Sequence, residues 1–123
     1  MARVNRIPWW EWWVPFRRWR IVAVFEAADE IPARLPARGA VVVGSLERPK
    51  WIAFDCPCRT GHRIMVTLDP GHRPHWTIVA GKKLTLSPSV DYHVSGQRCH
   101  YFIRHGSVDW VQDSYGGQRG SRR

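Results

Sequence analysis

The stretch from residue 40 to residue 54, AVVVGSLERPKWIAF, decides the fold class of this 123-residue chain. Residues 40–44 and 50–54 are short runs of β-branched and aromatic side chains, which are typical of strands. The polar residues between them, at 45–49, suit a turn. The stretch therefore predicts two buried strands joined by a turn.

Similar short runs continue outward from this pair. Residues 26–39 contain two prolines and a glycine, which predict a loop with at most a short helical turn. Residues 80–82 and His105-Gly106 are short links typical of hairpins. Further strands are expected at 19–25, 63–68, 76–79, 83–86, 101–104 and 107–111. Together they predict a mostly β, small single domain of about seven short antiparallel strands.

Both ends of the chain differ in composition from residues 18–115, which are expected to form the β domain. Residues 1–17 hold four tryptophans between Pro8 and Pro15, and this proline spacing predicts an extended arm rather than a long helix. The indoles could fold back over the domain's own sheet, dock on a partner or lie at a membrane interface. Residues 116–123 contain nothing to bury, so a disordered basic tail is expected.

The net charge of +9 comes mostly from the two ends of the chain. Residues 1–20 hold five arginines and one acidic residue, and residues 118–123 hold three arginines. A folded nucleic-acid-binding domain is expected to carry its basic residues on the domain itself rather than at the chain ends, so nucleic acid is not favoured as a partner. No run approaches the roughly 20 apolar residues of a membrane span, and no secretory signal is evident. A cytoplasmic location without a membrane partner is expected.

The three cysteines predict a metal site rather than a disulfide, because a bridge between Cys56 and Cys58 would close a very small, strained ring. Two thiolates one residue apart on a turn can converge on one soft cation, and Zn²⁺ prefers sulfur and imidazole ligands. The predicted zinc ligands are Cys56, Cys58 and Cys99, with His100 as the expected fourth ligand and His62 as its competitor. The alternative is that small cysteines simply fill the core.

A second interpretation makes Cys99 a nucleophile, since a thiolate activated by a histidine can attack an acyl carbon. Adjacent residues on a strand point to opposite faces, so His100 is poorly placed to be its base. The predicted catalytic residues are then Cys99 and His62, with His93 as a further candidate base.

Several linked motifs lie between residues 40 and 111. They are Phe54-Asp55-Cys56-Pro57-Cys58, Gly61-His62, Trp76, residues 84–90, and residues 99–110, which begin Cys99-His100. Together they resemble the bacterial domain of unknown function 6527 family. The resemblance implies a metal-containing peptidase that processes or deconjugates a ubiquitin-like protein, in operons tied to antiviral defence. Its implied partners are that ubiquitin-like protein or its conjugating enzymes.

The chain departs from that family in two motifs. Many relatives carry a third cysteine where this chain has Thr60, and a cysteine and a serine where it has Gln97 and Cys99. If that serine is a nucleophile, Cys99 is a chemically competent replacement. A non-enzymatic zinc-binding module that docks a protein partner or nucleic acid is the alternative function.

Overall fold

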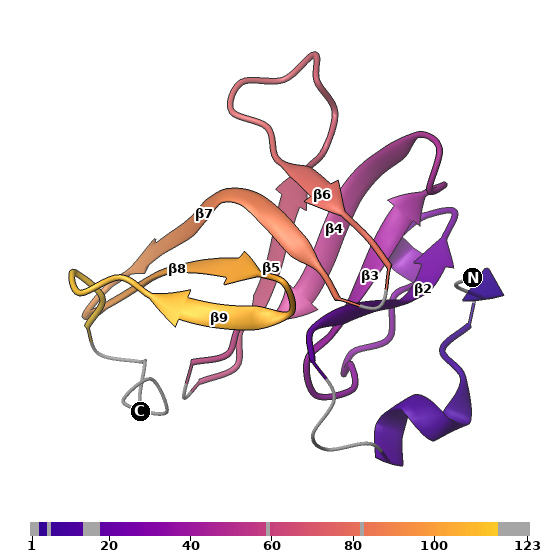
Figure 1. Ribbon diagram of the computed structural model, residues 1–123, viewed down its shortest axis with the longest axis horizontal. Helices are drawn as coiled ribbons and strands as arrows, with labels where there is room; N and C mark the ends of the chain where they lie inside the picture. The colour runs from indigo at the N-terminus through magenta and orange to yellow at the C-terminus, as the bar shows by residue number, and fades with distance from the viewer. Residues whose placement is uncertain (1–2, 5, 14–17, 59, 82, 116–123) are drawn as a thin grey trace.

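Nine strands form two sheets in the computed structural model, which describes residues 3–4, 6–13, 18–58, 60–81 and 83–115 (Figure 1). Two short 3-10 helices accompany them, and neither is long enough to cross a membrane. The elements are β1 (Arg3–Val4), η1 (Trp9–Trp13), β2 (Arg20–Phe25), η2 (Ala28–Glu30), β3 (Gly39–Gly44), β4 (Pro49–Asp55), β5 (Arg63–Thr67), β6 (Thr77–Val79), β7 (Thr85–Val94), β8 (Gln97–Arg104) and β9 (Ser107–Trp110). The predicted mostly β class is confirmed.

The first sheet has the order β1-β2-β3-β4-β5 and the second the order β6-β7-β8-β9. All pairs are antiparallel except those of β2, which runs parallel to both β1 and β3. The parallel pairing differs from the expected antiparallel arrangement. Two parallel neighbours need a long connection, and residues 26–38 are enough to carry the chain from the end of β2 back to where β2 begins.

The second sheet is more extensive than its apolar runs indicate. Its central strand β7 continues for eight residues beyond Leu86, through serine, proline, aspartate and histidine positions that resemble a loop. The register of β7 against β8 shifts between Leu86 and Val90, so this strand contains a bulge. The predicted hairpin at His105-Gly106 is confirmed: both residues have positive φ, of 52° and 80°, as a type I′ turn requires.

The main core lies between the two sheets and a smaller one lies on the other face of the first sheet. Residues of β4, β5, β7 and β8 fill the main core, among them Phe54, Ile64, Leu86 and Tyr101. Val41 belongs to the smaller core, whereas its neighbour Ala40 belongs to the larger. Because β3 is covered on both faces, its sequence is a continuous apolar run rather than an alternation.

The tryptophan-rich segment forms a 3-10 helix at residues 9–13 instead of an extended chain. Its four tryptophans are 43–75% exposed. Glu11 is instead the buried residue of the helix, and its Oε1 accepts hydrogen bonds from Arg20 Nη2 at 2.6 Å and Nε at 2.9 Å. Arg20 Nη1 also donates to the carbonyls of Ala37 and Arg38. An ion pair thus fastens η1 to β2.

The predicted tail at residues 116–123 lies outside the described residues.

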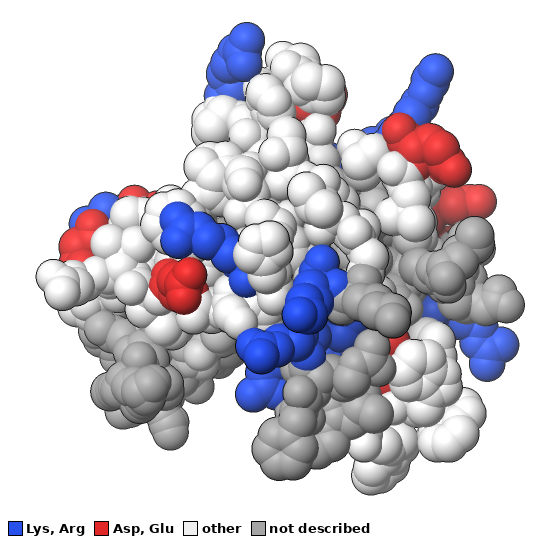
Figure 2. Space-filling view, in the orientation of Figure 1, with Lys and Arg blue, Asp and Glu red and all other residues white. Residues whose placement is uncertain are grey.

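Charge is unevenly spread over the face seen in Figure 2. Some lysines and arginines on this face gather in one group near its lower centre, and others stand apart from it. A nucleic-acid backbone is followed by a longer basic track. Among the residues that the structure describes, this face therefore offers one basic group rather than a stripe.

Candidate metal centre and candidate active site

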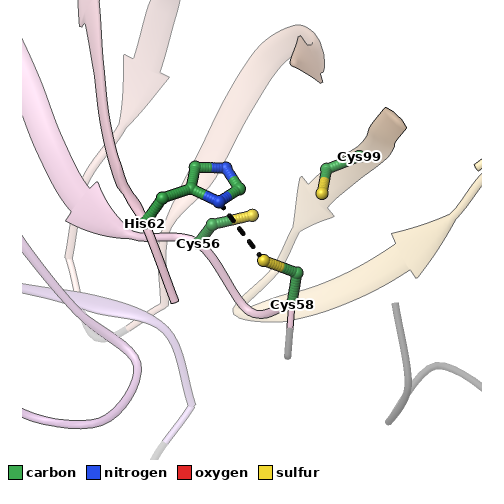
Figure 3. A group of neighbouring side chains, drawn as sticks. All are labelled: Cys56, Cys58, His62 and Cys99. Carbon is green, nitrogen blue, oxygen red and sulfur yellow. Dashed lines mark hydrogen bonds between the residues drawn. The ribbon is translucent and has the colours of Figure 1, made fainter. Parts of the chain in front are cut away.

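Four side chains converge beside the main core: Cys56, Cys58, His62 and Cys99. One ligand atom from each lies within 4.8 Å of all the others. The first three come from the connection between β4 and β5, and Cys99 comes from β8. Figure 3 shows the three sulfur atoms and the imidazole facing one another. Two segments far apart in sequence thus meet at one point.

The connection after β4 is shaped so that its side chains turn inward. Cys56 N–H donates to the His62 carbonyl at 2.7 Å, which closes the turn that contains Cys58. Gly61 has a φ of +65°, a conformation that residues with a Cβ rarely adopt. Cys58 Sγ lies 3.4 Å from His62 Nδ1 and 3.1 Å from Thr60 Oγ1. The turn therefore places the second thiol and the imidazole side by side.

The donor set suits a metal ion. Three sulfurs and one imidazole are the ligands of closed tetrahedral zinc sites, where Zn–S distances of about 2.3 Å set sulfurs roughly 3.8 Å apart. His62 Nε2 is buried and has no hydrogen-bond partner among the described residues. Burial lowers the pKa of His62, which favours the neutral imidazole that a metal requires. The cluster could hold a metal ion.

The three thiols differ in acidity. Burial raises the pKa of Cys58, but hydrogen bonds from the Thr60 hydroxyl and the Gly61 backbone outweigh it and lower the value to about 7. Burial raises the pKa of Cys56 and of Cys99. Two thiols are therefore uncharged at neutral pH unless a cation replaces their protons.

A second constellation lies on the other face of the second sheet. Ser89 Oγ is 3.0 Å from His100 Nε2, and His100 Nδ1 is 2.9 Å from Asp113 Oδ1 and 3.2 Å from Oδ2. The imidazole is 19% exposed and the carboxylate 42% exposed. Serine, histidine and aspartate are thus joined in series and open to solvent at one end.

The geometry of this constellation follows from the pleat of β8. Its burial alternates along the strand, so Cys99 points into the core and His100 points out. Ser89 lies in the bulge of β7, and bulges often re-aim side chains next to active sites. The alternation thus separates the two clusters although they share a strand.

Asp113 reaches His100 because residues 111–115 fold back along β8. Val111 N–H donates to the His100 carbonyl at 2.8 Å, and the backbones of Arg98 and Tyr115 exchange two hydrogen bonds. The Ser114 hydroxyl accepts from His100 N–H and donates to the His100 carbonyl. These bonds hold the segment that carries Asp113 against the histidine.

Arg98 ties the carboxylates of this face together. Its Nε and Nη2 donate to the two oxygens of Asp91 at 2.9 and 2.8 Å, and its Nη1 lies 3.1 Å from Asp113 Oδ2. The hydrogen bonds from Arg98 lower the pKa of Asp91. The guanidinium therefore limits the positions that Asp113 can take.

The structure brings three predicted ligands, Cys56, Cys58 and Cys99, together with His62. His100, the expected fourth ligand, lies on the opposite face and contacts Ser89 and Asp113 instead. The predicted nucleophile Cys99 and its base His62 do share a cluster, but Cys99 is fully buried. Sequence reasoning missed Ser89 and Asp113, although the alternation along β8 was a usable signal for separating Cys99 from His100.

A serine, a histidine and a carboxylate hydrogen-bonded in this order are the arrangement that serine hydrolases use. Histidine accepts the serine proton through one ring nitrogen, and the carboxylate orients the ring through the other. The fold and this geometry thus define a small two-sheet β protein with the parts of a serine hydrolase.

The chain belongs to the BubE family, described as a bacterial ubiquitination-like system serine protease, which it matches over residues 27–111. The match contains all four residues of the metal cluster together with Ser89 and His100, and it ends before Asp113. The family supports the predicted association with ubiquitin-like conjugation, under another name than the resemblance suggested. No curated protein and no solved structure matches the chain.

Proposed function

We propose that this chain is a serine protease that acts on a ubiquitin-like protein. It cleaves the bond that follows the last residue of that protein, either to remove an extension, which is processing, or to release an attached protein, which is deconjugation. Ser89 is the nucleophile, His100 the general base and Asp113 the residue that orients the imidazole. The observation that carries the proposal is the unbroken series of hydrogen bonds from Ser89 Oγ to His100 and from His100 to Asp113. The ubiquitination-like system of the family supplies the substrate class.

The reaction follows from these contacts. Ser89 Oγ attacks the scissile carbonyl carbon while its proton passes to His100 Nε2. The C–N bond then breaks, and the leaving amine takes that proton, which leaves an ester on Ser89. Water attacks the ester, gives a proton to His100 and releases the carboxylic acid as Ser89 recovers its proton. Asp113 stays ionised and stabilises the imidazolium that forms twice in each turnover.

We propose a structural Zn²⁺ held by Cys56, Cys58, His62 and Cys99, with His62 in place of the expected His100. When bound, the ion supplies a cross-link between the β4–β5 connection and β8. Cys99 is assigned the ligand role, because a fully buried thiol whose pKa is raised is a poor nucleophile. The chain's own residues on the outer face carry out the chemistry.

Two substitutions separate this proposal from a cysteine hydrolase and from a non-enzymatic module. The substrate is the ubiquitin-like protein of the same system carrying a C-terminal extension, and trimming is followed by mass spectrometry. Ser89→Ala should slow trimming by at least about 10³-fold while zinc content and melting temperature stay as in the wild type.

Cys99→Ala should release zinc and lower the melting temperature. Trimming by Ser89→Ala at the wild-type rate would reject Ser89 as nucleophile. Loss of trimming in a zinc-loaded, fully folded Cys99→Ala would support the thiol instead. A wild type that trims nothing would leave the docking module as the better account. The predicted role in antiviral defence and the cytoplasmic location stay predictions.

A further inference from the structure

The strand that carries Ser89 has an edge that its own sheet leaves uncovered. β6 pairs with β7 only at Thr85, Leu86 and Ser87, whereas β7 continues to Val94. Figure 1 shows β7 running on past β6 with β8 along its other side. Beyond Ser87, no strand of the described chain pairs with the side of β7 that faces away from β8.

The backbone groups on that side can be assigned from the hairpin. A two-residue turn, Ser95-Gly96, joins β7 to β8, so its closing pair, Val94 and Gln97, is hydrogen-bonded. Alternation then turns the N–H and C=O of Asp91 and His93 away from β8. The same alternation on β8 is seen in its backbone groups, because those of Arg98 and His100 bond to residues 111–115, on the side away from β7.

Two side-chain contacts show which side of Ser89 is open. The Trp76 indole donates to the Ser89 carbonyl at 3.2 Å, so that carbonyl faces the β6 side of the strand. His100 approaches Ser89 Oγ from β8, on the opposite side. A substrate carbonyl can therefore reach Oγ from the part of the edge beyond Trp76 without displacing the base.

The residues along this edge are accessible. His93 is 60% exposed and Val94 is 46% exposed. No backbone hydrogen bond to Asp91 or His93 from outside the sheet is found in the described parts of the chain. An edge strand with free N–H and C=O groups recruits an extended peptide by adding a strand.

We propose that the edge of β7 at Asp91 and His93 binds the C-terminal segment of the ubiquitin-like protein as an added strand, with the scissile carbonyl beside Ser89. This inference rests on the proposed function. Recognition through backbone groups fits a flexible, extended tail, because a folded segment has no free main-chain groups to offer. Trp76 closes the β6 end of the edge, so the added strand lies toward Val94.

A pair of variants tests the backbone contact. His93→Pro and His93→Ala both lose the imidazole, but only the proline removes the N–H that faces the edge, and edge strands tolerate proline. Trimming of the extended ubiquitin-like protein should be about tenfold slower with His93→Pro than with His93→Ala. Both variants should hydrolyse p-nitrophenyl acetate, which has no chain to pair, at the same rate as each other. Equal trimming by the two variants would overturn the proposal.

A second test needs no variant of the enzyme. Peptides of the substrate tail are N-methylated at one position at a time, and each is offered to the wild-type chain. Pairing predicts that methylation at alternate positions slows cleavage, since only every second amide faces β7. A loss without a period of two, or no loss, would overturn the proposal.

The outcomes separate the two levels of inference. If Ser89→Ala still cleaves both substrates, the proposed function fails. If Ser89→Ala is inactive and methylation has no alternating effect, the function stands and the edge proposal fails. If the wild type dimerises as its concentration rises and His93→Pro does not, the edge binds a second copy, which also overturns the proposal.

Discussion

The two faces of the β7–β8 hairpin differ in almost every respect although they share a backbone. On the inner face, Cys99 is fully buried and the Tyr92 ring stacks on His62 at a centroid distance of 4.0 Å. On the outer face, Ser89 and His100 are partly open to solvent and bonded to each other. The difference teaches that neighbours in sequence, such as Cys99 and His100, serve separate sites when a strand's pleat divides them.

The largest expected effect is on the inner face. Cys58→Ser should lose about one equivalent of zinc, and a structural zinc site contributes on the order of 10 kcal/mol to folding. The melting temperature should therefore fall by more than about 10 °C. Elemental analysis and thermal unfolding measure both, with Ser89→Ala as the outer-face control. A wild type that contains no metal yet unfolds cooperatively would contradict the zinc assignment.

A smaller effect is expected from the residue that positions the outer face. Arg98→Lys leaves one ammonium group where a planar guanidinium now bonds to both Asp91 and Asp113, so Asp113 loses its restraint. We expect kcat for tail trimming to fall about tenfold, with KM within about twofold and zinc content unchanged.

Arg104→Lys provides the matched control for this experiment. Arg104 forms an exposed ion pair with Asp109 on the same sheet, with a separation of 3.5 Å. Its replacement should change kcat by less than about twofold, because exposed pairs contribute little. An equal fall in both variants would show that Arg98 has no special positioning role.

The smallest expected effect is on the pH dependence of stability. Hydrogen bonds from Arg98 hold the pKa of Asp91 below its usual value of 3.8, so this carboxylate stabilises the fold at neutral pH. That contribution is lost as pH falls from about 4 through the lower pKa of the folded state. Asp91→Asn should therefore give a flatter dependence of unfolding free energy on pH below about 4, measured by urea denaturation. Parallel curves for variant and wild type would contradict this.

Many of the strands could be predicted because buried strands consist mainly of apolar residues. β3 and β4 were expected at residues 40–44 and 50–54, since strands covered by neighbours need continuous apolar side chains. β7 was expected only at residues 83–86 because, of its residues beyond Leu86, only Val90 is buried. Pairing with β8 and the packing of Val90 and Tyr92 against the main core hold that part of the strand.

The candidate sites were predictable to different degrees. Cysteine is a typical ligand of soft metal ions, so the residue type alone was enough to predict Cys56, Cys58 and Cys99 as ligands. Because adjacent residues point to opposite faces of a strand, Cys99 and His100 cannot both reach one ion from β8, and the alternation therefore favours His62 as the fourth ligand. Ser89 and Asp113 stand in no local motif with His100, because a bulge and a returning segment bring them together. Only the three-dimensional fold connects them.

The Glu11–Arg20 ion pair, rather than apolar packing, holds η1 in place, so the residues on the exposed side of η1 contribute less to the stability of the fold. Most surface helices are held by the apolar residues of their own inner face, so their exposed face is chosen within that constraint. Here Glu11 and Arg20 hold the helix, and Trp9 and Trp13 are 74% and 75% exposed. In evolutionary terms, the fold constrains Trp9 and Trp13 less than it constrains Glu11, so these two positions can change at a smaller cost in stability.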